Sequence, residues 1–294
     1  MFPLPDMTCD ARWMKLASLV SAAVLIGPAC ICPTLAQGGQ TPTPSPNPEP
    51  SDPCTPLIAI VTRPTITTSV CTVRPGHVLI ENGYTNTVTT GTGGGVTINY
   101  PQSLVRVGVA QHMEISFAPP SFERSSLGAA IASGSSDMGI GAKWELGYTD
   151  SSSWGAGFFI TGATGDPAFT AGATQYSGLL NWTYTLDPTF GLSGTVSFNS
   201  LAAANAAGQY QQYSAIIPSF VLTASLPGQP SQLFAEYTYY SHAGPGLGNR
   251  GLFDFGYARD FGPHVQFDIE YGTQSPLLNG GPTHYFGAGL SLMN

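Results

Sequence analysis

Charge is scarce in this 294-residue chain. Only 9% of the residues are charged, against about a quarter in soluble domains, and lysine occurs only at Lys15 and Lys143. A net charge of −8 with so few cations disfavours binding to the phosphate backbone, so we expect no nucleic-acid partner. Such a shortage of charge also argues against an ordinary soluble enzyme, whose surface carries far more.

Long apolar runs are also lacking, apart from residues 16–31. A bundle of membrane-spanning helices is therefore excluded, because each helix needs about 20 consecutive apolar residues. Arg12 and Lys15 precede the run and Ala36 closes a small-x-Ala site, which predicts a secretory signal peptide over residues 1–36. Met14 is an alternative start to Met1. A retained anchor and lipoprotein processing at Cys30 or Cys32 are the alternatives to cleavage after Ala36.

Proline alternates with other residues over positions 41–50, which favours extended polyproline II structure. We therefore predict a disordered Pro-rich linker over residues 37–56 and a periplasmic segment over residues 57–76. Cys54 and Cys71 are the cysteines that remain in the exported chain, and a disulfide between them is the preferred interpretation. Two free thiols are the alternative.

From His77 onward the apolar residues recur with a period of two, as in β-strands with two different faces. In residues 137–148, for example, Ile140 and Trp144 share one face while Lys143 and Glu145 share the other. The pattern predicts twelve strands, over residues 77–88, 102–109, 112–119, 136–148, 153–163, 174–186, 189–199, 212–226, 231–241, 250–260, 263–272 and 283–293.

The connections between these strands alternate in length. Short turns, such as Asp187-Pro188, alternate with long loops, which we place near residues 89–101, 120–135, 164–173, 200–211, 242–249 and 273–282. An even strand count with short turns at one end and long loops at the other is typical of outer-membrane barrels. We therefore predict an all-β fold, a transmembrane antiparallel up-and-down barrel over residues 77–294, with a soluble β-sandwich as the alternative.

Two consequences of a barrel can be checked. The last strand, 283–293, should pair antiparallel with the strand that starts near His77, because an open edge in lipid leaves backbone groups unpaired. The apolar face should point outward to lipid, and the residues expected there include Met138, Ile140, Trp144, Leu180, Trp182, Phe267 and Ile269.

With the apolar face toward lipid, the charged residues fall inside the barrel. The predicted lumen-lining residues are Glu81, Arg106, Glu114, Asp137, Lys143, Glu145, Glu236, Asp254, Asp268 and Glu270. They would either form an acidic passage that favours neutral or cationic solutes, or pair with one another and fill a narrow lumen.

No catalytic or cofactor pattern stands out, and we expect neither an enzyme nor a cofactor. Ser241, His242 and Asn249 are the nearest approach to the Ser, His and Asn set of barrel lipases, but adjacent residues on a strand point to opposite faces. The five histidines lack metal-ligand spacing, so no metal site is expected. Gly91-Thr92-Gly93-Gly94-Gly95 has no surrounding strand–helix unit that would make it a phosphate-binding loop.

Several short motifs occur in a familiar order. Thr62-Arg63-Pro64-Thr65-Ile66-Thr67 is followed by Val73-Arg74-Pro75-Gly76 and by Glu81-Asn82-Gly83-Tyr84, then by Ser136-Asp137-Met138-Gly139-Ile140-Gly141-Ala142-Lys143. Over residues 60–294 the chain thereby resembles a family of bacterial outer-membrane barrels described as transporters, or as proteins of the MetA pathway of phenol degradation. It departs from the family pattern at Val61-Thr62, where an Asp would precede Arg-Pro, and at its non-aromatic end, Asn294.

The resemblance implies a channel in the bacterial outer membrane for small solutes, aromatic or hydrophobic compounds among them. Its partners would be the lipids of that membrane and the solute. The alternative is a non-conducting structural or surface-interaction barrel, and ion conductance in a planar bilayer separates the two.

Overall fold

A computed structural model describes residues 52–294 except 92–93, 128–129, 206–207 and 276–280. The predicted signal peptide and residues 37–51 of the predicted linker lie outside the described residues. No helix among the described residues is long and apolar enough to cross a membrane.

The described chain contains one short helix, α1 (Leu57–Ile60), followed by β-strands. The strands are β1 (Val78–Thr89), β2 (Gly95–Tyr100), β3 (Leu104–Ala110), β4 (Met113–Ala118), β5 (Phe122–Leu127), β6 (Ala130–Ser135), β7 (Gly139–Tyr148), β8 (Ser152–Thr161), β9 (Gln175–Thr185), β10 (Phe190–Ala204), β11 (Tyr210–Ser225), β12 (Ser231–Tyr240), β13 (Arg250–Asp260), β14 (Val265–Gln274) and β15 (Thr283–Met293).

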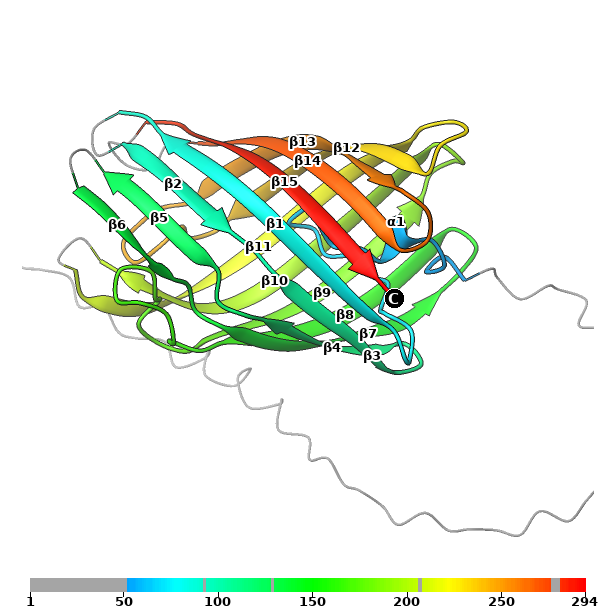
Figure 1. Ribbon diagram of the computed structural model, residues 1–294, viewed down its shortest axis with the longest axis horizontal. Helices are drawn as coiled ribbons and strands as arrows, with labels where there is room; N and C mark the ends of the chain where they lie inside the picture. The colour runs from blue at the N-terminus through cyan, green and yellow to red at the C-terminus, as the bar shows by residue number, and fades with distance from the viewer. Residues whose placement is uncertain (1–51, 92–93, 128–129, 206–207, 276–280) are drawn as a thin grey trace, which may run out of the picture. The chain divides into compact units, whose positions relative to one another are not determined.

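The strands form a closed antiparallel barrel. β15 pairs with β1 along its whole length, from Leu79 opposite Met293 to Thr89 opposite Thr283. The predicted closure is therefore confirmed. Figure 1 shows the strands crossing the barrel obliquely, with the C-terminus at the same end as α1.

Three of the wall strands are interrupted. β1 pairs with β3 through its first residues and with β2 through its last, so β2 and β3 are two halves of one interrupted strand. β4 and β5, and likewise β6 and β7, continue one another in the same way. Counted so, the described wall has the predicted twelve strands.

The prediction of loops over residues 89–101 and 120–135 is wrong, because much of these stretches is the strands β2, β5 and β6. In β6, alanine, serine and glycine give little strand preference of their own. All three strands are paired on both of their edges or to a paired neighbour in the sheet, as Thr97 of β2 is with Thr87 of β1 and Ser125 of β5.

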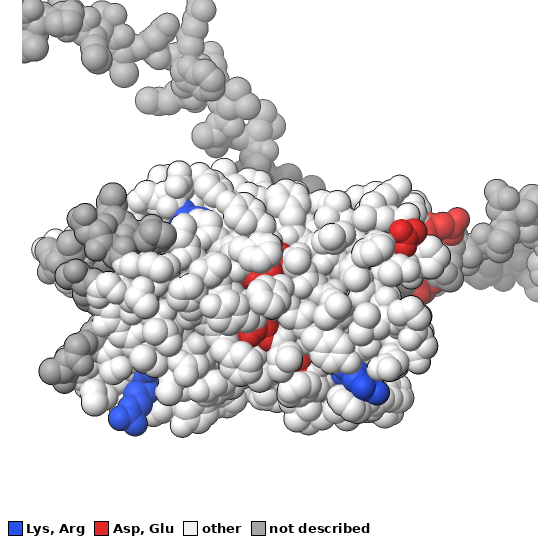
Figure 2. All heavy atoms as spheres, turned by 90° about the horizontal axis from the view of Figure 1, so that it is seen from above, with Lys and Arg blue, Asp and Glu red and all other residues white. Residues whose placement is uncertain are grey.

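The outer face of the barrel is apolar, and Figure 2 shows one side of it with charged residues in only a few small patches. Of the seven residues expected outside, six are between 37% and 55% exposed, and Trp182 is half-buried because it packs against Phe220 and over Gly194. So many exposed apolar side chains would be a liability in water and are the normal surface of a barrel in lipid.

Candidate functional site: the lumen and its N-terminal plug

The barrel lumen is occupied by the residues that precede β1. Residues 52–75, which we call the plug, contain α1 and a disulfide between Cys54 and Cys71. Both half-cystines are buried in a small apolar cluster with Leu57, Ile60 and Leu79, the last of which belongs to β1. The stretch that the sequence analysis describes as a periplasmic segment thus lies inside the barrel.

Carboxylates on the barrel wall bind the backbone of the plug. Inward glutamates of four strands accept hydrogen bonds from plug N–H groups, which have no strand or helix partner of their own. The pairs are Glu81 with Thr62 and Arg63 (3.1 and 3.0 Å), Glu236 with Ile66 and Thr67 (2.7 and 2.6 Å), Glu145 with Thr72 (2.5 Å) and Glu114 with Val73 (2.7 Å). Because buried backbone groups need partners, the wall takes the place of secondary structure for this segment.

Donors on the wall bind the plug carbonyls in the same way. Arg106 Nη1 and Nη2 donate to the carbonyls of Ile60 and Cys71 at 2.7 and 2.9 Å. Lys143 Nζ and Asn181 Nδ2 both donate to the Ser69 carbonyl, at 2.9 and 2.7 Å. The plug is therefore held at many points through its main chain, with its N–H groups donating to the wall and its carbonyls accepting from the wall.

Arg106 is the centre of this arrangement. Its guanidinium makes a two-pronged contact with Glu114 at 2.8 and 2.9 Å and reaches Glu81 Oε1 at 2.7 Å. Lys143 Nζ lies 3.5 Å from Glu114, and all four side chains are buried. Buried charges are tolerated when they are paired and hydrogen-bonded, and here the pairing also holds the plug.

Carboxylates also gather on the wall formed by β13 and β14. Asp254, Asp268 and Glu270 are buried there, and Arg63 of the plug reaches Asp268 at 3.4 Å and Glu270 at 3.9 Å. Tyr285 donates to Asp254 at 3.0 Å. One oxygen of Asp254 and one of Asp268 have no hydrogen-bond partner among the described residues. This side of the lumen is consequently the more acidic one.

Asp137 differs from the other predicted lumen residues. It lies just before β7 and accepts hydrogen bonds from the N–H groups of Thr164, Gly165 and Ala171, in the loop after β8. Its contacts order a loop and are not with the plug.

Sequence reasoning did not single out several residues that contact the plug. Asn181, Thr195 and Ser219 lie on the inward phase of β9, β10 and β11, but they are uncharged and their alternation alone does not mark them. Arg63 belongs to the Arg-Pro-Thr motif that carries the family resemblance, and no sequence pattern shows that it points back into the lumen.

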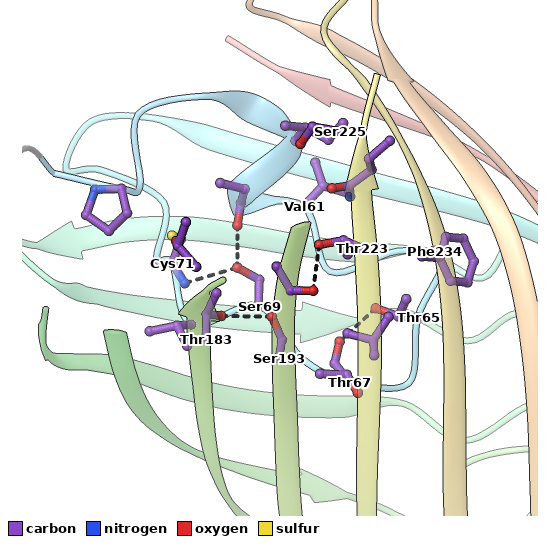
Figure 3. Close-up of a pocket in the computed structure, with 18 of the residues that line it drawn as sticks. Val61, Thr65, Thr67, Ser69, Cys71, Thr183, Ser193, Thr223, Ser225 and Phe234 are labelled. Carbon is purple, nitrogen blue, oxygen red and sulfur yellow. Dashed lines mark hydrogen bonds between the residues drawn. The ribbon is translucent and has the colours of Figure 1, made fainter. Parts of the chain in front are cut away.

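A cavity of about 330 Å³ lies between the plug and the strands β9–β12 (Figure 3). On the wall it is lined largely by small hydroxyl side chains, among them Thr183, Ser193, Thr223 and Ser225. It extends to Asp187, Pro188 and Thr189, which form the exposed short turn between β9 and β10. Space therefore remains beside the plug, and it reaches the short-turn end of the barrel.

A closed barrel with a lipid-facing apolar surface and a polar, plugged lumen defines the chain as a bacterial outer-membrane β-barrel. A family model described as "Putative MetA-pathway of phenol degradation" matches residues 62–292. The chain belongs to this family. No curated protein matches its sequence.

Several solved structures are similar to this chain. An outer membrane channel from Pseudomonas putida F1 is 12% identical, with a TM-score of 0.58 over 76% of this chain and 97% of that one. The NanC porin is 10% identical, with a TM-score of 0.49 over 73% and 98% of the two chains. The CymD monoaromatic hydrocarbon channel is 8% identical, with a TM-score of 0.41 over 76% and 89%.

Ser241 and His242, which belong to the nearest approach to a lipase-like set, lie close together just after β12. Ser241 Oγ lies 3.5 Å from His242 Nδ1 and also accepts a hydrogen bond from the Ile216 N–H at 2.9 Å.

Proposed function

We propose that the protein is a channel through which small solutes cross the outer membrane, and that phenol-like aromatic compounds are among them. The observation that carries the proposal is the make-up of the lumen, which is wide enough to hold a folded segment and still leaves a cavity beside it. The family description supplies the link to phenol.

The predicted lumen residues have a double role in this proposal. Glu81, Arg106, Glu114 and Lys143 hold the plug in place, since their charges are directed at one another and at its backbone. Asp254, Asp268 and Glu270 make the β13–β14 side of the lumen acidic, and their negative potential disfavours anions.

Conductance of the purified, folded protein in planar bilayers tests the proposal, together with swelling of proteoliposomes in phenol, in its uncharged analogues and in a sugar of larger size. We expect weak cation preference and passage of phenol faster than through protein-free vesicles. A protein that inserts but gives neither conductance nor swelling above the lipid background would contradict a channel.

The alternative, a structural barrel that conducts nothing, is favoured by one observation. The plug is bound at many points, and its charged partners are nearly all engaged. The two functions differ in the same bilayer experiment, because only a channel conducts or lets solutes pass with its plug in place.

We also propose that residues 1–36 are removed on export and that residues 37–56 link the mature N-terminus to the plug. The composition of the two stretches supports this division. N-terminal sequencing of protein purified from outer membranes should begin at Gln37.

A further inference from the structure

We infer that solutes pass the plug on one side only, through the hydroxyl-lined cavity along β9, β10 and β11. We further infer that Asn181, Thr195 and Ser219 form the gate at its inner end. The inference rests on the proposed channel function and specifies the route and the class of solute.

The plug is bound unequally on its two sides. Toward β1, β3, β4 and β7 it meets charged side chains, with Arg106, Glu81, Glu114 and Lys143 buried against it. Toward β9–β11 its hydrogen bonds are to uncharged side chains. Hydrogen bonds that involve charged groups are the stronger ones, so β9–β11 themselves hold the plug less firmly than the charged side does. The charged contacts near this side come from neighbouring strands, where Glu236 of β12 binds Ile66 and Thr67 and Lys143 of β7 binds Ser69.

Strand register arranges the β9–β11 wall in successive layers. Asn181, Thr195 and Ser219 are directly opposite one another and form the innermost layer. One step toward the short turns lie Thr183, Ser193 and Val221, and another step brings Thr185, Gly191 and Thr223. The outer two layers line the cavity, while the innermost layer is buried against the plug.

The innermost layer closes the cavity by three kinds of hydrogen bond to plug residues 67–69. Thr67 Oγ1 donates to Ser219 Oγ at 2.9 Å, the Thr68 N–H donates to Thr195 Oγ1 at 2.9 Å, and Asn181 Nδ2 donates to the Ser69 carbonyl at 2.7 Å. A shift of these three plug residues would open the cavity into the rest of the lumen. Such a shift also breaks the contacts of Thr67 with Glu236 and of Ser69 with Lys143, while the disulfide and the Arg106 contacts could stay in place.

The lining indicates which solutes fit. Arg63 and Asp187 are the charged residues among those that line the cavity, and Arg63 is directed at Asp268 and Gln102. Serine and threonine hydroxyls can replace a few hydrogen bonds to water, but they replace the hydration shell of an ion only in part, so ions pass more slowly than small uncharged molecules. The route therefore suits small uncharged molecules that carry a hydroxyl or a similar group.

Covalent modification of a cavity residue tests the route. Thr223→Cys places a thiol on the cavity wall, and the native disulfide remains. Cationic or anionic methanethiosulfonate is added from each side of a bilayer that contains the folded variant. We expect a loss of most of the conductance, and shifts of the reversal potential in opposite directions for the two reagents.

Ser116→Cys is the matched control, because Ser116 lies on β4, on the same inward face as Glu114, on the charged side of the plug. Its treatment should leave the conductance unchanged. A modified Thr223→Cys protein with unaltered conductance and selectivity would overturn the route. So would a thiol at 223 that reacts in urea but not in the folded protein.

Loosening of the gate gives an independent test. Thr195→Val with Ser219→Ala removes hydrogen-bond partners of plug residues Thr68 and Thr67. We expect a several-fold higher open probability and faster phenol-driven swelling. Thr97→Val with Ser125→Ala removes a comparable hydroxyl contact between β2 and β5 and should change neither. Equal behaviour of the two double variants contradicts the gate.

The outcomes separate the route from the proposed function. A parent protein without conductance or swelling contradicts the channel itself. A conducting parent that is insensitive at position 223 contradicts only the route. Unchanged mobility shift on heating in gel electrophoresis shows for each variant that the barrel has folded.

Discussion

Replacement of Arg106 by methionine should be the most damaging single change in the lumen. The side chain is 1% exposed and donates to Glu81, to both oxygens of Glu114 and to two plug carbonyls. Methionine has a similar length but no donor. Two buried carboxylates would then lose their main partner while they remain charged.

The size of the effect follows from what is left behind. Breaking a buried ion pair by removal of one partner costs about 3–5 kcal/mol, because a charge is left without compensation. Lys143 still lies 3.5 Å from Glu114, and plug N–H groups still donate to both carboxylates. We therefore expect a loss near the lower end, about 3 kcal/mol in the free energy of unfolding.

Urea titration of the protein in lipid vesicles, followed by tryptophan fluorescence, measures this loss. Arg106→Lys should recover only part of it, since an ammonium group cannot make the two-pronged contact with Glu114. The triple variant Arg106→Met, Glu81→Gln, Glu114→Gln should be more stable than Arg106→Met alone, because no uncompensated charge remains. An unfolding midpoint of Arg106→Met equal to that of the parent would refute the reasoning.

Three further predictions concern the plug and the wall. Glu236→Gln puts an amide N–H against one of two plug N–H donors, that of Ile66 or that of Thr67. It should therefore weaken the binding of these plug residues by about 1–3 kcal/mol and raise the open probability in bilayer recordings. The control Glu123→Gln on β5 should leave the open probability unchanged. Replacement of Cys54 and Cys71 by serine removes a crosslink across 17 positions and should lower plug stability by about 3 kcal/mol, seen as faster proteolysis after residue 56 with the barrel intact. Ile140→Arg should lower barrel stability in urea titrations by about 2–4 kcal/mol, because it turns a charge toward lipid. Leu186→Arg, next to the short turn, should lower it by only about 0–1 kcal/mol. Equal losses for the two variants would contradict the outward orientation of Ile140.

Alternation of polarity along the chain determines the barrel. Each strand residue carries its own preference for lipid or for the lumen, so Ile140 and Lys143 reveal their faces without knowledge of any neighbour. Closure follows too, because a sheet edge cannot stand open in lipid, and the pairing of residues 283–293 with the first strand could be predicted from the sequence. Strands with weak preferences of their own, such as β6, could not, since the neighbouring strand supplies what stabilises them.

Only the tertiary structure decided what fills the lumen. Residues 57–76 show no period, because their backbone is bound by side chains and not by a repeating ladder. Ile66 and Thr67, for instance, find their partner at Glu236, 170 and 169 positions away. The sequence predicted that Arg106, Glu81 and Glu114 point into the lumen. It left open whether these side chains line a passage or pair with one another. Pairing and plug binding depend on which strands stand side by side and on where the N-terminal segment enters, and both are properties of the closed barrel rather than of any local stretch of chain.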